Sequence, residues 1–201
     1  MKREEAELKF LVAGDNNTGK TSLLLSYLTQ NGDQEYLPKH LDTTIHTIFI
    51  GDTKVDLHFW DLLGSDYSKL RPLSYPGTKI TILCYDITNP ESFFFATKVL
   101  FPEILNALLG TKATIWLLGT KKDQRTKPGF KGISYEMGQA QAKLYKIHFD
   151  EICTHDVSDV NSFIHRVTCA QLKCNTPLEY PCKRFSQQYE VGLTSYHLYF
   201  H

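Results

Sequence analysis

The sequence predicts an α/β protein built on a mostly parallel, doubly wound sheet of six strands, with one antiparallel edge hairpin and helices on both faces. Three observations support this fold class. A glycine loop separates the first apolar segment from the first helical one, two alternating segments are joined by a short turn, and strand and helix patterns alternate after residue 79. Such alternation is typical of crossover connections between parallel strands.

The first half of the chain contains three of the expected strands. Residues 8–13 (LKFLVA) form an apolar run that ends at Gly14, and helical spacing after Lys20 continues to a stop at Gly32. Residues 44–50 and 54–60 alternate in polarity and are separated by Gly51, Asp52 and Thr53. This pattern predicts a β-hairpin.

The second half supplies the remaining strands and helices. We expect strands at residues 79–87, 113–119 and 149–153. Helices are expected after Asn89 and Pro90, around residues 139–146, and at residues 160–173. The first two of these helices connect strands that therefore run in the same direction, and the third follows the last strand.

The length and composition fit one domain with a tail. The 201 residues are 42% hydrophobic, which is enough for a real core. We expect the domain at residues 1–175, followed by a tail at 176–201 that loses periodicity but keeps six aromatic side chains. Two alternatives stay open for this tail, because it can dock on the domain or a partner, or remain mobile.

The charge balance excludes broad classes of partner. Twenty-two basic residues balance 22 acidic ones, so we expect no nucleic-acid binding and no general attraction to anionic membranes. The charged start MKREEAE does not fit a signal peptide, and no apolar run reaches the length of a membrane span. We expect a cytoplasmic, monomeric protein.

The five cysteines are expected to be free thiols, since their number is odd and they lack paired short spacings. His165, Cys169 and Cys174 could be considered zinc ligands, but no close Cys-x-x-Cys turn anchors them. Packing of these cysteines as small hydrophobic residues is the better interpretation.

GDNNTGKT, at residues 14–21, has the spacing of a phosphate-binding P-loop. In such a loop, backbone N–H groups surround phosphates, the lysine reaches their oxygens and the hydroxyl meets Mg²⁺. The alternative is a glycine turn that only connects strand and helix. The expected nucleotide-binding residues here are Gly14, Asn16, Asn17, Thr18, Gly19, Lys20, Thr21 and Ser22.

A second signal is GTKKD, at residues 119–123, directly after an apolar strand. Doubly wound folds bind ligands at the carboxyl ends of their strands. The Asp123 carboxylate can accept hydrogen bonds from guanine N1–H and the 2-amino group, whereas adenine offers an acceptor at N1. Asp123 is therefore expected to select guanine, although an exposed charged turn is the alternative for this segment alone.

Three further segments carry a family resemblance. WDLLGSDYSKLRPLSYP (residues 60–76), NPESF and ISYEMGQAQAK resemble segments of the Ras superfamily, and of its Rho/Rac family in particular, over about residues 7–173. The resemblance implies a G domain that binds GTP or GDP with Mg²⁺. It assigns nucleotide or magnesium roles to Lys20, Thr21, Asp61, Gly64, Thr120, Lys121 and Asp123, with Thr21 and Asp61 at the metal. The fifth guanine segment is weaker, because Cys153, Thr154 and His155 stand where the family has Cys-Ser-Ala; Thr154 and His155 are still assigned to the nucleotide.

Departures from the family predict impaired hydrolysis. Asn16 and Asn17 replace residues that are usually small, and a side chain at Asn16 would intrude where the catalytic groups approach. After Asp61 the family's Thr-Ala-Gly-Gln becomes Leu-Leu-Gly-Ser, so Ser65 lies near the position of the missing glutamine. A serine is too short to orient the attacking water in the same way. We therefore expect no intact catalytic residue.

The first switch segment also departs from the family. Lys39 falls where a threonine would close over Mg²⁺ and the γ-phosphate, and an ammonium cannot ligate a cation. Lys39 either pairs with phosphate directly or points into water. Effectors or regulators are expected to bind through residues 34–44 and 61–76, with weak affinity for ordinary Rac effectors. The chain lacks Cys-a-a-X at its end, so no lipid anchor is expected.

The leading hypothesis is an atypical Rho-like GTP-binding protein that is deficient in hydrolysis and acts as a signalling and protein-interaction module. One alternative is a pseudoGTPase scaffold that binds no nucleotide. The other is a slow but working GTPase.

Overall fold

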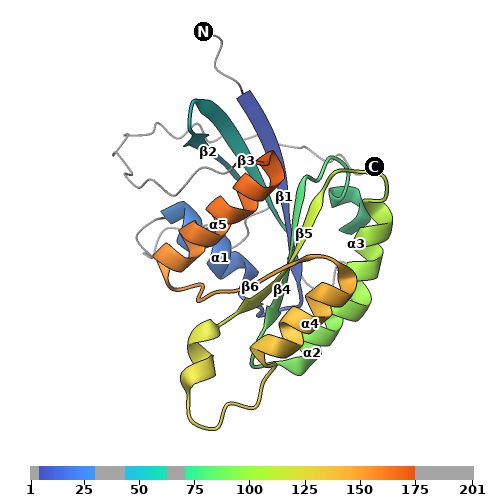
Figure 1. Cartoon of the computed structure of the whole chain (residues 1–201), viewed down its shortest axis with the longest axis vertical. Coiled ribbons are helices and arrows are strands. Elements are labelled where there is room, and N and C mark those ends of the chain that lie inside the picture. Colours follow the sequence, from blue (N-terminus) through green and yellow to red (C-terminus); the bar gives the residue numbers. More distant parts are fainter. Residues whose placement is uncertain (1–4, 30–43, 63–70, 175–201) are drawn as a thin grey trace, which may run out of the picture.

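A computed structural model describes residues 5–29, 44–62 and 71–174. These residues contain one six-stranded sheet with the order β2-β3-β1-β4-β5-β6 (Figure 1). Neighbouring strands are parallel except for β2 and β3, which form the antiparallel edge hairpin. The predicted fold class is therefore confirmed. The strands are β1 (Glu5–Gly14), β2 (Thr44–Ile50), β3 (Thr53–Asp61), β4 (Ile80–Asp86), β5 (Thr114–Thr120) and β6 (His148–Glu151).

Helices cover both faces of the sheet. Figure 1 shows α1 and α5 on one face and α2, α3 and α4 on the other. Within the described ranges the helices are α1 (Lys20–Thr29), α2 (Pro90–Phe94), α3 (Phe101–Ala107), α4 (Tyr135–Tyr145) and α5 (Val157–Leu172). A π-helical segment, η4 (Phe95–Leu100), joins α2 to α3, and short 3-10 turns occur at η3 (Arg71–Ser74) and η5 (Lys122–Thr126).

Local signals explain where several elements begin. The Asn89 side chain caps α2 by accepting hydrogen bonds from two backbone amides. The Ser134 side chain caps α4 by accepting a hydrogen bond from one backbone amide. Helix α5 begins three residues earlier than the apolar spacing predicts, because the Asp156 carboxylate accepts from the amides of Ser158 and Asp159. The hairpin turn is also tighter than expected, since Ile50 pairs directly with Thr53.

The helix after Asn89 is longer and less regular than its sequence indicated. Pro102 lacks a backbone N–H, and its ring disfavours a regular α-helical turn before it. The amide of Phe101 donates to the carbonyl of Ala96, five residues earlier, which is π-helical spacing. The widened turn at η4 thus lets one continuous helical stretch pass through the proline.

The hydrophobic core has two parts, one on each face of the sheet. Phe10, Phe59 and Phe163 belong to the part under α1 and α5, and Leu117 and Ile104 belong to the part under α3 and α4. Every residue of β4 is buried, as expected for a central parallel strand covered on both faces. This rigid centre fixes the loops at the carboxyl ends of the strands.

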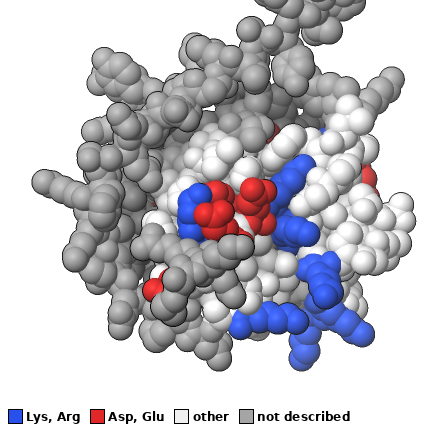
Figure 2. Space-filling view, turned by 90° about the horizontal axis from the view of Figure 1, so that it is seen from above, with Lys and Arg blue, Asp and Glu red and all other residues white. Residues whose placement is uncertain are grey.

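The end of the sheet where β1 begins carries charges of both signs. Figure 2 shows acidic side chains gathered near the middle of this face, with lysine and arginine on both sides. The Lys54 ammonium donates a hydrogen bond to Asp56 Oδ2, 3.1 Å away. This hydrogen bond and the negative charges of Asp56, Glu5 and Glu7 raise the pKa of Lys54. Among the described helices, none is long and apolar enough to cross a membrane.

Candidate functional site

The loop between β1 and α1 has a backbone that only particular residues permit. A Cβ on Gly14 would lie 2.4 Å from the carbonyl oxygen of Cys84, which is an impossible approach. Gly19 has φ +82° and Asn17 has φ 59°, both in the left-handed region. Glycine adopts this region freely and asparagine tolerates it better than most residues. Asn17 is therefore compatible with the loop conformation.

Polar contacts inside the loop converge on Asp15. Its carbonyl oxygen accepts from the Thr18 hydroxyl at 2.8 Å and from the Lys20 ammonium at 2.7 Å. Its carboxylate accepts from the backbone amide of Asn16 at 2.8 Å. Lys20 is only 7% exposed, so a positive charge is buried beneath the loop. A buried ammonium favours an anion at this place, because charge removed from water needs an opposite charge nearby.

The start of α1 meets the end of β3. The hydroxyl of Thr21 donates to the Asp61 carboxylate over 2.7 Å. The two residues are forty positions apart in the chain. They meet because β1, which leads into α1, pairs in parallel with β3, which ends at Asp61. A hydroxyl and a carboxylate are hard oxygen ligands of the kind that Mg²⁺ prefers. Ser22, the next residue of α1, is half-buried.

Thr120 ties the end of β5 to the same loop. Its hydroxyl is fully buried and lies 2.7 Å from the carbonyl oxygen of Thr18 and 3.0 Å from that of Tyr85. A Cβ on Gly19 would be 3.6 Å from side-chain atoms of both Thr120 and Thr154. Thr154 is thus buried beside the loop, whereas His155 is exposed.

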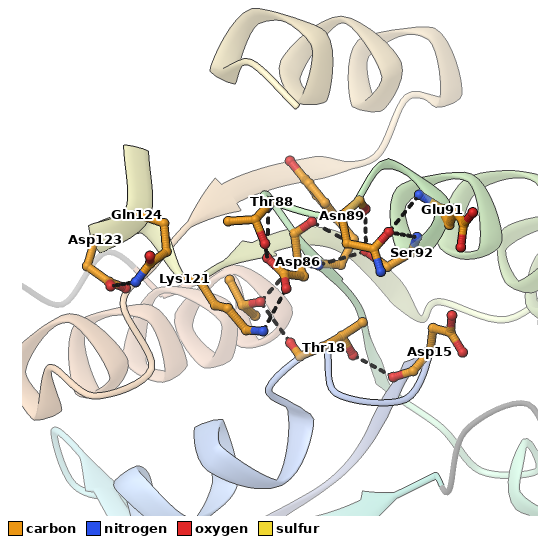
Figure 3. Close-up of polar contacts among 12 residues, drawn as sticks. Asp15, Thr18, Asp86, Thr88, Asn89, Glu91, Ser92, Lys121, Asp123 and Gln124 are labelled. Carbon is orange, nitrogen blue, oxygen red and sulfur yellow. Dashed lines mark hydrogen bonds and ion pairs between the residues drawn. The ribbon is translucent and has the colours of Figure 1, made fainter. Parts of the chain in front are cut away.

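Lys121 forms an ion pair that the sequence analysis missed (Figure 3). Its backbone is left-handed, with φ 59°, and its ammonium lies 2.6 Å from Asp86 Oδ2. Thr88 donates its amide and its hydroxyl to Asp86 Oδ1, at 2.8 and 2.7 Å. Burial alone would raise the pKa of Asp86, but the hydrogen bonds from Lys121 and Thr88 outweigh it and the pKa is lowered. Asp86 is ionised at neutral pH. The available signal was its position, since a carboxylate at the end of β4 lies beside the end of β5.

Asp123 lies in the short turn η5 and is exposed. The Gln124 side-chain amide donates to Asp123 Oδ2, as Figure 3 shows. The turn is held close to the end of β6, because the Lys122 amide donates to the carbonyl of Ile152 at 3.2 Å. The carboxylate is therefore open to solvent on a backbone that the sheet fixes.

Comparison with known proteins identifies the family. The sequence model of the Ras family matches residues 9–173. The chain belongs to the Ras family. It is 31% identical to the Rho-related protein racI of Dictyostelium discoideum, over 78% of this chain and 84% of that protein. It is 34% identical to the Ras-like GTP-binding protein RhoL of Drosophila melanogaster, over 68% and 71%. It is 36% identical to the Rho-related GTP-binding protein RhoF of Mus musculus, over 59% and 56%. The chain is a Rho-like member of the Ras family, a family of small GTP-binding proteins.

Most residues assigned to the nucleotide from the Ras-family resemblance are brought together by the fold. The P-loop residues 14–22 lie beside Asp61, Thr120 and Thr154 through the contacts given above. The sequence-derived positions Lys39, Gly64 and Ser65 lie outside the described residues. So do residues 34–43 and 63–70 of the partner segments 34–44 and 61–76, and the tail 176–201.

Proposed function

We propose that this Rho-like chain binds guanine nucleotide with Mg²⁺, hydrolyses GTP poorly and acts as a signalling and protein-interaction module. The observation that carries the proposal is the pairing of Thr21 with Asp61 at 2.7 Å, next to the buried Lys20 of a P-loop. These three side chains supply two hard oxygen ligands and one cation at the same end of the sheet.

The residues present fit the nucleotide and its cation. Gly14 permits the close approach of the loop to the Cys84 backbone, Gly19 permits its left-handed turn, and Lys20 offers a buried positive charge to phosphate. Thr21 and Asp61 would hold Mg²⁺, whose charge would neutralise phosphate oxygens when bound. Thr120 supports the loop through Thr18, and Lys121 is held by Asp86 at the end of β4. Asp123 would present its carboxylate to a guanine edge. Thr154, buried beside Gly19, belongs to the same proposed site, and the exposed His155 is assigned by sequence alone.

The proposed deficiency in hydrolysis rests on the P-loop and on the segment after Asp61. Asn16 is exposed at the loop, so its side chain projects from the surface where a small residue would leave space. Leu62, directly after Asp61, is buried and its amide donates to the Val12 carbonyl at 2.9 Å. The sequence continues with Leu63, Gly64 and Ser65, without glutamine. Glutamine positions the attacking water in Ras, where even the intact intrinsic rate is only about 10⁻⁴ s⁻¹.

The proposed partners bind through residues 34–44 and 61–76. Residues 71–76 belong to the described part of the second segment. Arg71 pairs with Glu103 of α3 at 2.9 Å, and the Tyr75 hydroxyl donates to the same carboxylate at 2.6 Å. Leu73, between them, is 76% exposed. Because Arg71 and Tyr75 are both fixed to Glu103, the exposed Leu73 side chain between them has a defined position. An exposed apolar side chain of this kind suits contact with a protein effector or regulator.

One experiment tests nucleotide binding directly. The protein is purified without added nucleotide, with and without EDTA, then denatured, and the released nucleotide is identified by chromatography. We expect guanine nucleotide that EDTA removes, and GTP rather than GDP. A Lys20→Ala variant should be empty, while Lys131→Ala, at an exposed position away from the loop, should behave as the parent chain. An empty parent chain that also fails to bind added GTP or GDP in Mg²⁺ would contradict the proposal and favour the scaffold.

A second experiment tests hydrolysis. The protein is loaded with GTP and followed in a single turnover. We expect a rate below the intrinsic rate of about 10⁻⁴ s⁻¹ given for Ras. A rate at or above that value, abolished by Ser65→Ala, would support a slow but working GTPase instead.

A further inference from the structure

The end of helix α5 brings two cysteines together. Cys169 lies in the last turn of the helix and Cys174 follows its end. Lys173, between them, has φ 56°, and its amide and that of Cys174 both donate to the Cys169 carbonyl, the latter at 3.1 Å. The Cys174 bond is the six-to-one closure of a Schellman motif, in which the side chains of the first and last residues frequently meet. The folded backbone therefore presents the two thiols to each other.

The Cys174 side chain turns back to the end of the helix. Its Sγ lies 3.8 Å from the Cys169 carbonyl oxygen, to which the thiol donates a weak hydrogen bond. Both residues are half-buried at the margin of the core cluster under α5. Cys84, by contrast, is completely buried in β4, and burial raises the pKa of its thiol to about 12. Small oxidants can therefore reach the pair at the end of α5 more readily than they can reach Cys84.

A histidine lies next to the pair. His165 is one helical turn before Cys169, and each of its ring nitrogens is 3.7 Å from the Cys169 sulfur. Burial and the neighbouring charge of Arg166 lower the pKa of His165, so the imidazole is neutral at pH 7 and can accept a proton. Burial and the Cys174 thiol raise the pKa of Cys169 to about 12. Cys169 therefore needs such a base before it can act as a nucleophile.

We propose that Cys169 and Cys174 form a reversible disulfide when the protein meets a peroxide, and that this end of α5 is an oxidation site. In the first step the Cys174 sulfur attacks one oxygen of the peroxide and becomes a sulfenic acid. The other oxygen leaves as hydroxide and takes up the thiol proton, which gives one water. In the second step Cys169 attacks the Cys174 sulfur, His165 takes the Cys169 proton, and the departing hydroxide recovers that proton as water. Two thiols and one hydrogen peroxide thus give one disulfide and two waters.

A disulfide is the chemistry that this cluster supports best. The part of the chain that the structure describes has no group of three or more histidine, cysteine, aspartate or glutamate side chains placed to hold a metal ion. The ring that the bond closes is short, from Cys169 to Cys174, so it constrains the unfolded chain little. Its effect is local, because it joins Cys174 covalently to the last turn of α5.

Tryptic mapping tests the proposal on the full chain. Trypsin cleaves after Arg166 and Lys173, which places Cys169 in peptide 167–173 and Cys174 in peptide 174–183 together with Cys182. The protein is treated with hydrogen peroxide, its remaining thiols are alkylated, and it is digested with trypsin and with a protease that cleaves after Glu179. We expect a cross-link between peptides 167–173 and 174–179 that dithiothreitol removes.

Matched variants separate this bond from the alternatives. Cys182→Ser should keep the cross-link, whereas Cys169→Ser and Cys174→Ser should each abolish it. His165→Asn should slow its formation several-fold at pH 7 without changing the final product. A bond between Cys174 and Cys182, a bond between two copies of the chain, or full alkylation of Cys169 and Cys174 after peroxide would each overturn the proposal.

Discussion

The ammonium of Lys121 lies 2.6 Å from the carboxylate of Asp86, which links the carboxyl ends of two adjacent parallel strands. Thr88 holds the other oxygen of the same carboxylate, so the position of Lys121 is set from β4 as well as from its own segment. Lys121 has a left-handed backbone beside the exposed Asp123. The ion pair thus stabilises an unusual backbone conformation next to the proposed guanine contact.

Replacing Asp86 by asparagine should lower the free energy of unfolding by about 1–2 kcal/mol at pH 7, because the charged hydrogen bond to Lys121 is lost. The folded state lowers the pKa of Asp86, so its contribution is complete above the unfolded pKa of about 3.9 and is lost as pH falls through the folded value. Urea unfolding of parent and variant across this range measures the effect. An equal difference at acidic and neutral pH would contradict it.

The buried Glu151 should show the opposite pH dependence. It is 3% exposed and its carboxylate binds Arg125, yet burial outweighs this partner and raises the pKa of Glu151. Removing the partner with Arg125→Met should cost about 3 kcal/mol at pH 7, because a buried charge is left uncompensated. For a carboxyl whose folded pKa is raised, stability is highest below the unfolded pKa and is lost as pH rises through the folded value.

The cost of Arg125→Met should therefore shrink as the pH falls towards about 4. Adding Glu151→Gln to Arg125→Met is the matched control, since it removes the unpaired charge and should recover part of the lost stability. Denaturant unfolding of the single and double variants measures both effects. A double variant that is less stable than Arg125→Met at pH 7 would contradict this account.

Gly14→Ala should destabilise the protein by about 3 kcal/mol or more, because the new Cβ would collide with the Cys84 backbone carbonyl. Gly110→Ala is the control, since Gly110 has φ +77° but open space around it. That change should cost only about 1–2 kcal/mol of backbone strain. Thermal and urea unfolding compare the two, and similar losses would show that the close approach at Gly14 is not decisive.

Thr21→Ala should weaken the proposed Mg²⁺-dependent binding of GDP by about tenfold or more, because the hydroxyl that meets Asp61 is removed. Thr21→Ser keeps this hydroxyl and should bind nearly as well as the parent chain. Fluorescent GDP titrations in Mg²⁺ and in EDTA measure the affinity. If Thr21→Ala loses no affinity in Mg²⁺, the hydroxyl has no role at a cation.

Much of the fold could be predicted because its signals are local. Apolar runs and alternating polarity marked all six strands of the sheet within a few residues, and Gly51 with Asp52 marked the hairpin turn. The early start of α5 depended on the Asp156 cap, which apolar periodicity does not detect. The π-helical segment was not predicted, because Pro102 lies within a stretch whose other residues are compatible with a regular helix.

The candidate site could be predicted in part because its motifs have fixed spacing. The P-loop is indicated by the spacing of Gly14, Gly19, Lys20 and Thr21. The position of Asp123 just after a strand indicates the guanine contact. Asp86 was not assigned, because its ion-pair partner Lys121 lies 35 positions further along the chain, at the end of another strand. The roles of Lys39 and Ser65 remain predictions from sequence, since both lie outside the described residues.

The sequence by itself determined the order of elements, the phosphate-loop spacing and the family, because each depends on residues that are close in the chain. Only the tertiary structure decided which distant groups meet. Parallel pairing brought Thr21 to Asp61 and Lys121 to Asp86, and helix closure brought Cys174 back to Cys169. Hydrogen bonds and ion pairs act over a few ångströms, so these partnerships depend on where the sheet and helices place each side chain.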